Sequence, residues 1–323
     1  MPAHVYDVFN GDADGICALQ QLRLETPVPD NHLVTGVKRD IRLLDRLALV
    51  RNSRITVLDI SLDRNREELA TLLDQGNRIF YVDHHFSGEL PDHPALEAHI
   101  DPAPQTCTSL IVDRLLHGKY RAWAVVGAFG DNLDEAASEA AATLHLSRED
   151  LARLRETGIL LNYNGYGSEI TDLFFPPDEL FRQVHTFSDP LDFHAHAPAL
   201  QTLKKGFQED VARTETARPI QENGTSRVFQ LPGEPWARRV AGVFANRLAR
   251  QEKNCAHALI MPNPDSSLRI SVRAPLNDRK GADTLCRRFP TGGGRAAAAG
   301  INRLPPEMRD RFIQAFTNHF SRK

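Results

Sequence analysis

Carboxylate and imidazole side chains follow three short apolar runs in the N-terminal part of the sequence, at residues 5–9, 55–58 and 79–82. The residues that follow these runs are Asp12, Asp14, Asp59, Asp83, His84 and His85. Oxygen and imidazole ligands of this kind suit Mn²⁺ and related divalent ions better than structural zinc. Two such ions, about 4 Å apart, would clamp the attacking and leaving oxygens of a phosphoryl displacement. The alternative is a polar strand end whose histidines are ordinary hydrogen-bonded residues.

Alternating strand and helix patterns must position these side chains. Strand patterns occur at residues 5–9, 32–37, 54–59 and 78–83, with helix patterns between them. This alternation predicts an α/β fold with a doubly wound, mainly parallel sheet. Because ligands bind at the carboxyl ends of the strands in such sheets, we expect the carboxylates and imidazoles to meet at one edge.

The C-terminal part of the chain has the pattern of a second, smaller α/β domain. We expect strands at residues 226–231, 256–261 and 268–273, and helices at 236–250 and 306–320. The predicted organisation is a catalytic domain over residues 1–190, a helical linker over 191–218 and a substrate-binding domain over 219–323. Residues 162–167 form a turn-rich stretch that either lines the site with aromatic rings or is a packed surface loop.

A glycine-rich stretch in the second domain favours anion binding. Three consecutive glycines, Gly292 to Gly294, would let the backbone approach a ligand and turn its N–H groups inward. Four alanines at 296–299 predict that a helix follows, with an N-terminus that also favours anions. Arg273, at the end of a predicted strand, would hold a phosphate oxygen in a bidentate manner.

Taken in order, these motifs resemble those of the DHH phosphoesterase superfamily. Four elements match its DHH domain, and the segment from Gly292 to Gly300 is similar to the glycine motif of the associated DHHA1 domain. The four are Asp12-Ala13-Asp14-Gly15, Asp59, Asp83-His84-His85 and Gly127-Ala128-Phe129-Gly130-Asp131. The resemblance covers nearly the whole chain, and it is specific because all five elements occur in the family's order.

The resemblance implies a role for each candidate residue. Two divalent cations, Mn²⁺ for preference and Mg²⁺ or another ion as alternatives, would be held by Asp12, Asp14, Asp59, His84 and Asp131. Asp83 would orient an imidazole, and His85 would contact the scissile phosphate or protonate the leaving oxygen. A metal-bound hydroxide would attack phosphorus in a cleft between the domains. The rest of the substrate would contact Arg273, Arg295 and the backbone of Gly293 and Gly294.

Two positions depart from the family pattern. Arg295 stands where the family usually has a histidine after the three glycines, and arginine can grip phosphate but cannot bind a metal. Val8 stands where some members have a histidine four residues before Asp12. The second departure implies a missing ligand or an altered metal affinity.

Composition and charge limit the substrates and the location. The 323 residues carry a net charge of −3, whereas a protein that grips long nucleic acid usually has a basic excess. We therefore expect a phosphodiesterase for short oligonucleotides or dinucleotides, similar to the nano-RNases of the superfamily. A single-strand-specific exonuclease on longer nucleic acid is the alternative enzyme, and a non-catalytic nucleotide sensor is an alternative of another class. The sequence leaves RNA or DNA preference, cyclic or linear substrates and the polarity of attack open.

Cysteine usage and hydropathy indicate a cytoplasmic protein. The four cysteines are widely scattered and contain no CxxC pair. No stretch has the length of a membrane span, and the first residues lack the pattern of a signal peptide. We expect no membrane partner, and the oligomeric state stays open, a homodimer included.

Overall fold

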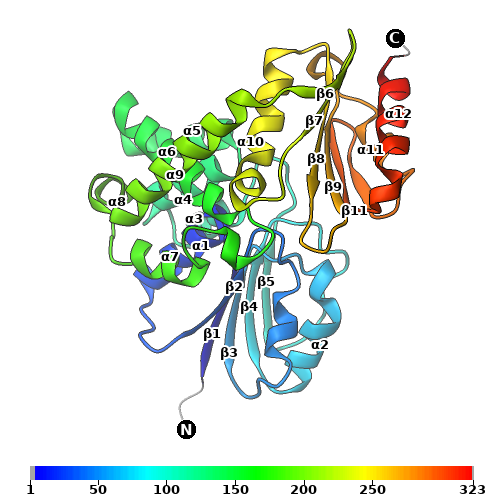
Figure 1. Ribbon diagram of the computed structural model, residues 1–323. Helices are drawn as coiled ribbons and strands as arrows, with labels where there is room; N and C mark the ends of the chain where they lie inside the picture. The colour runs from blue at the N-terminus through cyan, green and yellow to red at the C-terminus, as the bar shows by residue number, and fades with distance from the viewer. Residues whose placement is uncertain (1–3, 322–323) are drawn as a thin grey trace. The chain divides into compact units, whose positions relative to one another are not determined.

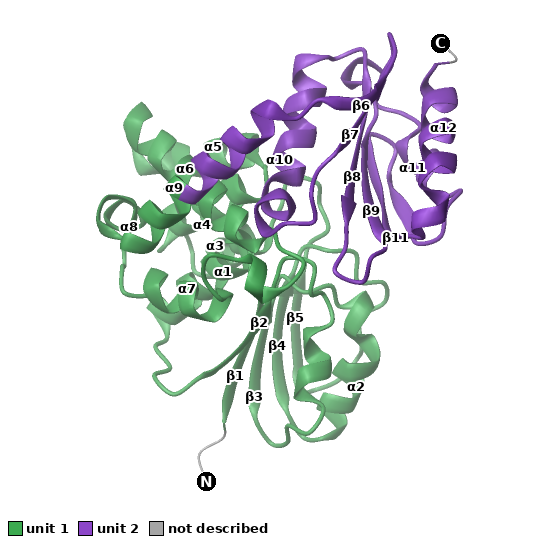
Figure 2. Ribbon diagram, viewed as in Figure 1, with its two compact units in different colours: residues 1–205 green, residues 206–323 purple. Residues whose placement is uncertain are grey.

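The computed structural model describes residues 4–321 and divides into two compact units, residues 1–205 and 206–323 (Figure 2). Helices α8 (Pro190–His196) and α9 (Pro198–Arg213) occupy most of the segment predicted as a helical linker. The predicted domain limits at residues 190 and 219 stay a prediction. None of the described helices combines the length and apolar character that a membrane crossing requires.

The first unit contains a five-stranded, fully parallel sheet with the strand order β2-β1-β3-β4-β5 (Figure 1). Its strands are β1 (Val5–Asn10), β2 (His32–Gly36), β3 (Arg54–Leu58), β4 (Arg78–Asp83) and β5 (Leu96–Ile100). The predicted α/β class with a parallel sheet is confirmed. Sequence patterns missed β5, a short edge strand that alternates polar and apolar residues and is only partly buried.

Helices cover both faces of this sheet. Helices α1 (Ala13–Glu25), α2 (Arg66–Asp74), α3 (Thr108–Leu115) and α7 (Pro177–Val184) lie against the strands. The unit also contains α4 (Arg121–Gly130), α5 (Asp134–Ala141), α6 (Arg148–Gly165), α8 and the start of α9. Leucines of α2 pack with Val8 and Val57 in one hydrophobic core. Phe9 points to the opposite face and contacts Phe181 of α7. Helix α4 packs against α1, α3 and α6.

Close packing of α4 against α1 and α6 depends on Gly130. A Cβ atom at this position would lie 2.3 Å from the Cβ of Ala13 and 3.0 Å from the carbonyl oxygen of Gly158. Although alanine is the better helix former, we expect Gly130→Ala to lower the free energy of unfolding by about 1–3 kcal/mol, because the helices must move apart. Urea unfolding measures the change. Gly242→Ala in α10 is the control, since a Cβ there meets open space and should not destabilise the protein.

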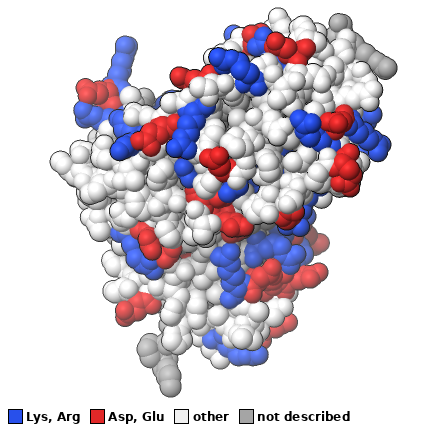
Figure 3. Space-filling view, in the orientation of Figure 1, with Lys and Arg blue, Asp and Glu red and all other residues white. Residues whose placement is uncertain are grey.

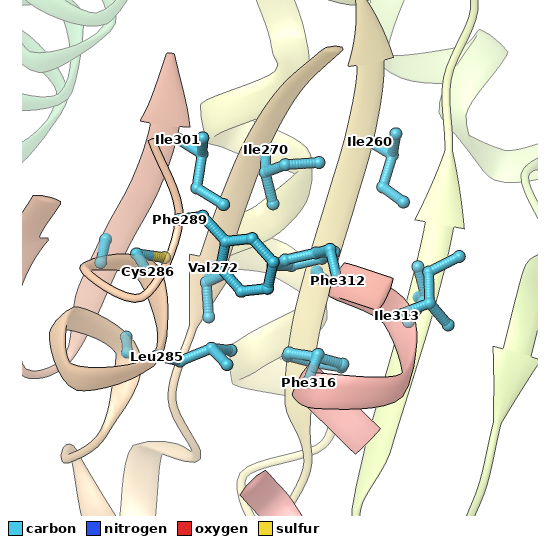
Figure 4. Packing of buried hydrophobic residues seen from close by; sticks show 14 of the residues in the cluster. Ile260, Ile270, Val272, Leu285, Cys286, Phe289, Ile301, Phe312, Ile313 and Phe316 are labelled. Carbon is cyan, nitrogen blue, oxygen red and sulfur yellow. The ribbon is translucent and has the colours of Figure 1, made fainter. Parts of the chain in front are cut away.

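The second unit contains a six-stranded sheet with the order β10-β11-β9-β8-β7-β6, antiparallel except for the β7–β8 pair. Its strands are β6 (Pro219–Glu222), β7 (Ser226–Gln230), β8 (Ala256–Pro262), β9 (Leu268–Arg273), β10 (Gly292–Arg295) and β11 (Ala298–Leu304). Helix α10 (Pro235–Gln251) packs on one face. Helices α11 (Ala282–Cys286) and α12 (Arg309–Phe320) cover the other face, where Phe289, Phe312 and Phe316 pack against strand residues (Figure 4).

The prediction of a helix after the three glycines is wrong. The glycines form strand β10, and the alanines form a turn and the start of the antiparallel strand β11. The helix propensity of alanine is overridden because both strands complete the sheet next to β9. Glycine is needed at position 292 because a Cβ there would lie 1.8 Å from the carbonyl oxygen of Cys286. The glycines and alanines thus form a hairpin, and anion binding by this segment stays a prediction.

His257 should make the stability of the chain depend on pH. It lies on β8 on the same face as Leu259 and Met261, and it is 1% exposed. Burial, aided by Arg227, lowers its pKa from 6.5 to about 4. At pH values between about 4 and 6.5, the imidazole of His257 is protonated in the unfolded chain but neutral in the folded chain. The free energy of unfolding should therefore fall by about 2 kcal/mol from pH 7 to pH 5. In urea unfolding, His257→Leu should remove this part of the pH dependence, and an unchanged dependence would contradict the assignment.

Candidate metal centre

The two aspartates that follow β1 lie at the start of α1. Asp12 is the N-cap, and its Oδ1 accepts the N–H groups of Asp14 at 3.0 Å and Gly15 at 3.1 Å. Both oxygens of Asp14 accept backbone N–H groups from the first residues of α3, Thr108 and Ser109, at 2.7 Å each. Two helix N-termini therefore fix two buried carboxylates at the carboxyl end of β1.

Asp59 follows β3 in a strained backbone conformation. Its φ angle is +58°, in the left-handed region that few residues other than glycine, asparagine and aspartate adopt. This conformation places its Oδ1 3.3 Å from the Oγ1 of Thr108 and 3.4 Å from the Nε2 of His84. Backbone strain at a buried carboxylate is typical of functional sites.

The side chains of Asp83, His84 and His85, at the end of β4, make different contacts. Asp83 is fully buried, and its Oδ1 lies 2.8 Å from the N–H of His84 and 2.7 Å from the Nδ1 of His85. The Nε2 of His84 lies 3.7 Å from Asp131, the residue that caps the C-terminus of α4. Asp83 thus contacts the imidazole of His85, while His84 faces the other carboxylates.

Lys38, directly beyond β2, also enters the site. Its ammonium contacts the Oδ2 of Asp12, and it lies 3.2 Å from the Oδ1 of Asp131 and 3.2 Å from the Oδ1 of Asn162. Asn162 belongs to α6, which continues to Gly165. The prediction of a turn over residues 162–167 is therefore wrong for its first four residues, which the helix holds beside the carboxylates.

Burial and mutual repulsion shift the pKa values of the site. Burial, together with Asp12 and Asp14, raises the pKa of Asp59 well above its ordinary value. Burial favours the protonated form of Asp12 as well, but the Lys38 ammonium outweighs this effect and lowers the pKa of that carboxyl. Burial opposes protonation of His84, yet Asp59, Asp14 and Asp131 raise its pKa to about 10. The carboxylates thus attract positive charge to the site.

The donor set fits a divalent cation. Ligand atoms of Asp14, His84 and Asp131 lie within 4.8 Å of one another, and so do those of Asp59, His84 and His85. Carboxylate and imidazole donors suit Mn²⁺, Mg²⁺ or a similar ion. Of the predicted ligands, Asp14, Asp59, His84 and Asp131 occur in these groups. Asp12 occurs in neither group among the described residues, and its carboxylate contacts the Lys38 ammonium.

The predicted substrate-binding residues lie on β9 and β10 of the second unit, on either side of β11. Arg295 of β10 and Arg273 of β9 both pair in register with Ala298 of β11, so both side chains stand on one face of the sheet, with their Cα atoms about 10 Å apart. Gly293 and Gly300, paired on the same face, carry no side chains. The guanidinium of Arg273 bonds to Asn246 at 2.8 Å and to Ser271 at 3.1 Å. This end of the face presents two cations beside a strip of small residues.

Sequence reasoning missed four residues of the site: Lys38, Thr108, Ser109 and Asn162. A signal existed for Lys38, because it directly follows a predicted strand whose carboxyl end lies at the same sheet edge as those of the other strands. The backbone donors of Thr108 and Ser109 carry no sequence signal, since any residue offers an N–H group. Asn162 was expected in a turn, whereas it lies on helix α6.

The chain has the fold of solved structures that contain a DHH domain. No family model and no curated protein sequence matches the chain. Among solved structures, the exonuclease RecJ bound to manganese has a TM-score of 0.66 at 15% identity, over 99% of this chain and 90% of its own. The DHH domain of a protein described as a member of a family of ribosomal proteins has a TM-score of 0.63 at 13% identity. The match covers 98% of this chain and 86% of the other.

A third similar structure is the pGpG-specific phosphodiesterase PggH from Vibrio cholerae. Its TM-score is 0.55 at 13% identity, over 98% of this chain and 99% of its own. These likenesses confirm the predicted resemblance to the DHH and DHHA1 proteins at the level of the fold.

Proposed function

We propose that this chain is a divalent-metal-dependent phosphodiesterase that hydrolyses short oligonucleotides or dinucleotides, with Mn²⁺ as the preferred ion. The observation that carries the proposal is the convergence of the buried Asp14 and Asp59 and the partly buried Asp131 on His84 at the carboxyl edge of the parallel sheet. Structures of the same fold include a phosphodiesterase and an exonuclease bound to manganese, which supports this chemistry.

Each residue of the site has a defined task in this proposal. When bound, the cation would supply an activated water and neutralise the charge that develops on the phosphate. Asp14, Asp59, His84 and Asp131 hold it, and the backbone N–H groups at the start of α3 fix the carboxylate of Asp14. Asp83 holds the Nδ1 of His85, which leaves the Nε2 of this imidazole for the substrate phosphate or the leaving oxygen. No covalent intermediate is needed.

The second unit supplies substrate binding in this proposal. Arg273 and Arg295 would each take a phosphate or carbonyl oxygen of the substrate, and the small residues between them leave room for a base or sugar. Both arginines lie at the same end of their strands, which suits a short polyanion. Basic and acidic side chains are also interspersed over the face of the molecule that Figure 3 shows, as expected for a protein without an extended nucleic-acid track.

Hydrolysis of end-labelled substrates from dinucleotides to long single strands, at fixed Mn²⁺ and salt, tests the proposal. We expect the rate to be highest for the shortest substrates and to vanish with chelator. Faster degradation of long strands would favour the single-strand exonuclease. Nucleotide binding without hydrolysis of any substrate would favour the sensor. Location in the cytoplasm is part of the proposal and is checked by cell fractionation.

A further inference from the structure

The side chain of Lys38 lies where a cation is expected. A lysine ammonium has three N–H donors, and three oxygens surround this one: the Oδ2 of Asp12, the Oδ1 of Asp131 and the Oδ1 of Asn162. Two of these oxygens belong to residues predicted to bind metal. The ammonium is a compact point charge, so it can neutralise carboxylates at the same place as a metal ion.

The backbone holds Lys38 in this position. Its N–H donates to the carbonyl oxygen of Gly165 at 3.0 Å, and its own carbonyl oxygen accepts from the Nδ2 of Asn10 at 3.3 Å. The lysine is thereby tied to the end of α6 on one side and to the end of β1 on the other. The contacts with the carboxylates thus come from a residue fixed at its backbone and not from a flexible surface side chain.

The end of β1 and the residues directly after it, up to Asp12, offer only one charged ligand beside Lys38. Val8, at the position of a family histidine, is fully buried in the hydrophobic core that includes α2 and cannot bind a metal. Asn10 lies nearer the site, but its Nδ2 is directed at Lys38, and its Oδ1 is buried without a hydrogen-bond partner among the described residues. An ion at this position would have Asp12 as its one anionic ligand from residues 8–12, and it would compete with an ammonium already in contact.

We propose that the Lys38 ammonium takes the place of a second metal ion, so that the chain binds one divalent cation and not two. The cation would be held by Asp14, Asp59, His84 and Asp131. Both groups of potential ligands in the structure include His84, and one imidazole nitrogen binds one ion. This inference rests on the proposed function and specifies how its metal centre is built.

Metal stoichiometry tests the inference without reference to activity. The full chain is stripped with chelator, titrated with Mn²⁺ and followed by metal analysis and electron paramagnetic resonance. We expect one ion per wild-type chain, with the spectrum of an isolated ion. The double variant Asn10→Asp, Lys38→Met frees Asp12 and adds a carboxylate beside it, so it should bind two ions and show exchange coupling between them.

Lys119→Met is the matched control. It removes the same charge from a surface pair with Glu25, and it should leave the stoichiometry at one ion. Two ions in the wild-type chain would overturn the inference and leave the proposed function intact. A double variant that stays at one ion would also overturn it. Absence of any bound ion, together with absence of hydrolysis, would overturn both the inference and the proposed function.

Discussion

Replacing His84 by alanine should abolish the metal-dependent hydrolysis, with kcat/KM falling by about a thousandfold or more, equivalent to about 4 kcal/mol of transition-state stabilisation. His84 is the one residue common to both groups of potential metal ligands, and its Nε2 lies within 4 Å of both Asp59 and Asp131. Its loss removes a ligand and leaves neighbouring carboxylates without a cationic partner. Steady-state kinetics at saturating Mn²⁺ and Mn²⁺ titration measure the two effects separately.

His99→Ala is the matched control for this variant. His99 lies on β5 beside Glu97, at 2.9 Å, and it belongs to neither ligand group. Its replacement should leave kcat/KM and Mn²⁺ affinity within about a factor of two of the wild-type values. Full activity of a correctly folded His84→Ala variant would show that the metal centre has been placed wrongly.

Arg23→Met should lower the free energy of unfolding by about 3–5 kcal/mol, because it leaves the buried carboxylate of Asp7 without its charged partner. The Nε of Arg23 donates to the Oδ2 of Asp7 at 2.8 Å. The Nη2 of Arg23 contacts the Oδ1 of Asp7 and lies 3.1 Å from the Oγ1 of Thr56. Asp7 is fully buried and Arg23 is 8% exposed. The pair joins β1, α1 and β3 below the candidate site. Urea unfolding with a fixed m-value measures the loss.

A double-mutant cycle measures the interaction energy of Asp7 and Arg23 apart from the contacts that each makes with other residues. Asp7→Asn combined with Arg23→Met should recover part of the loss, because no unpaired charge is then buried. Arg153→Met, which breaks exposed pairs on α6, should cost less than about 1 kcal/mol. If Arg23→Met destabilises the protein no more than Arg153→Met does, the buried pair does not contribute in the way expected.

The sequence predicted most of the first unit because, in a parallel sheet, the hydrophobic pattern of each strand also determines where the residues after that strand lie. Apolar runs that are buried on both faces are strong strand signals, and their carboxyl ends must share one edge. Asp59 and the triplet at 83–85 could therefore be placed together from the order of the strand patterns alone. The weakly patterned edge strand β5 gave no comparable signal, because half-exposed strands need neither a continuous apolar run nor β-branched residues.

Interactions that depend on tertiary pairing could not be predicted from local pattern. The alanines after the glycine motif have high helix propensity, yet the sheet of the second unit needs them as strand β11. Lys38 was overlooked because a lone lysine after a strand is usually a solvated residue, and its three oxygen partners come from sequence positions 12, 131 and 162. Such a contact appears only when distant segments are brought together.

The left-handed backbone at Asp59 determines which substitutions at this position would stabilise the fold. A positive φ at a residue with a Cβ costs about 1 kcal/mol or more, and burial beside Asp12 and Asp14 adds electrostatic repulsion. Glycine would relieve the backbone, and asparagine would relieve the repulsion while tolerating the conformation. A lineage that no longer needed the metal centre would therefore gain stability by replacing this residue first. We thus expect glycine or asparagine at position 59 in chains of this fold that lack the metal centre.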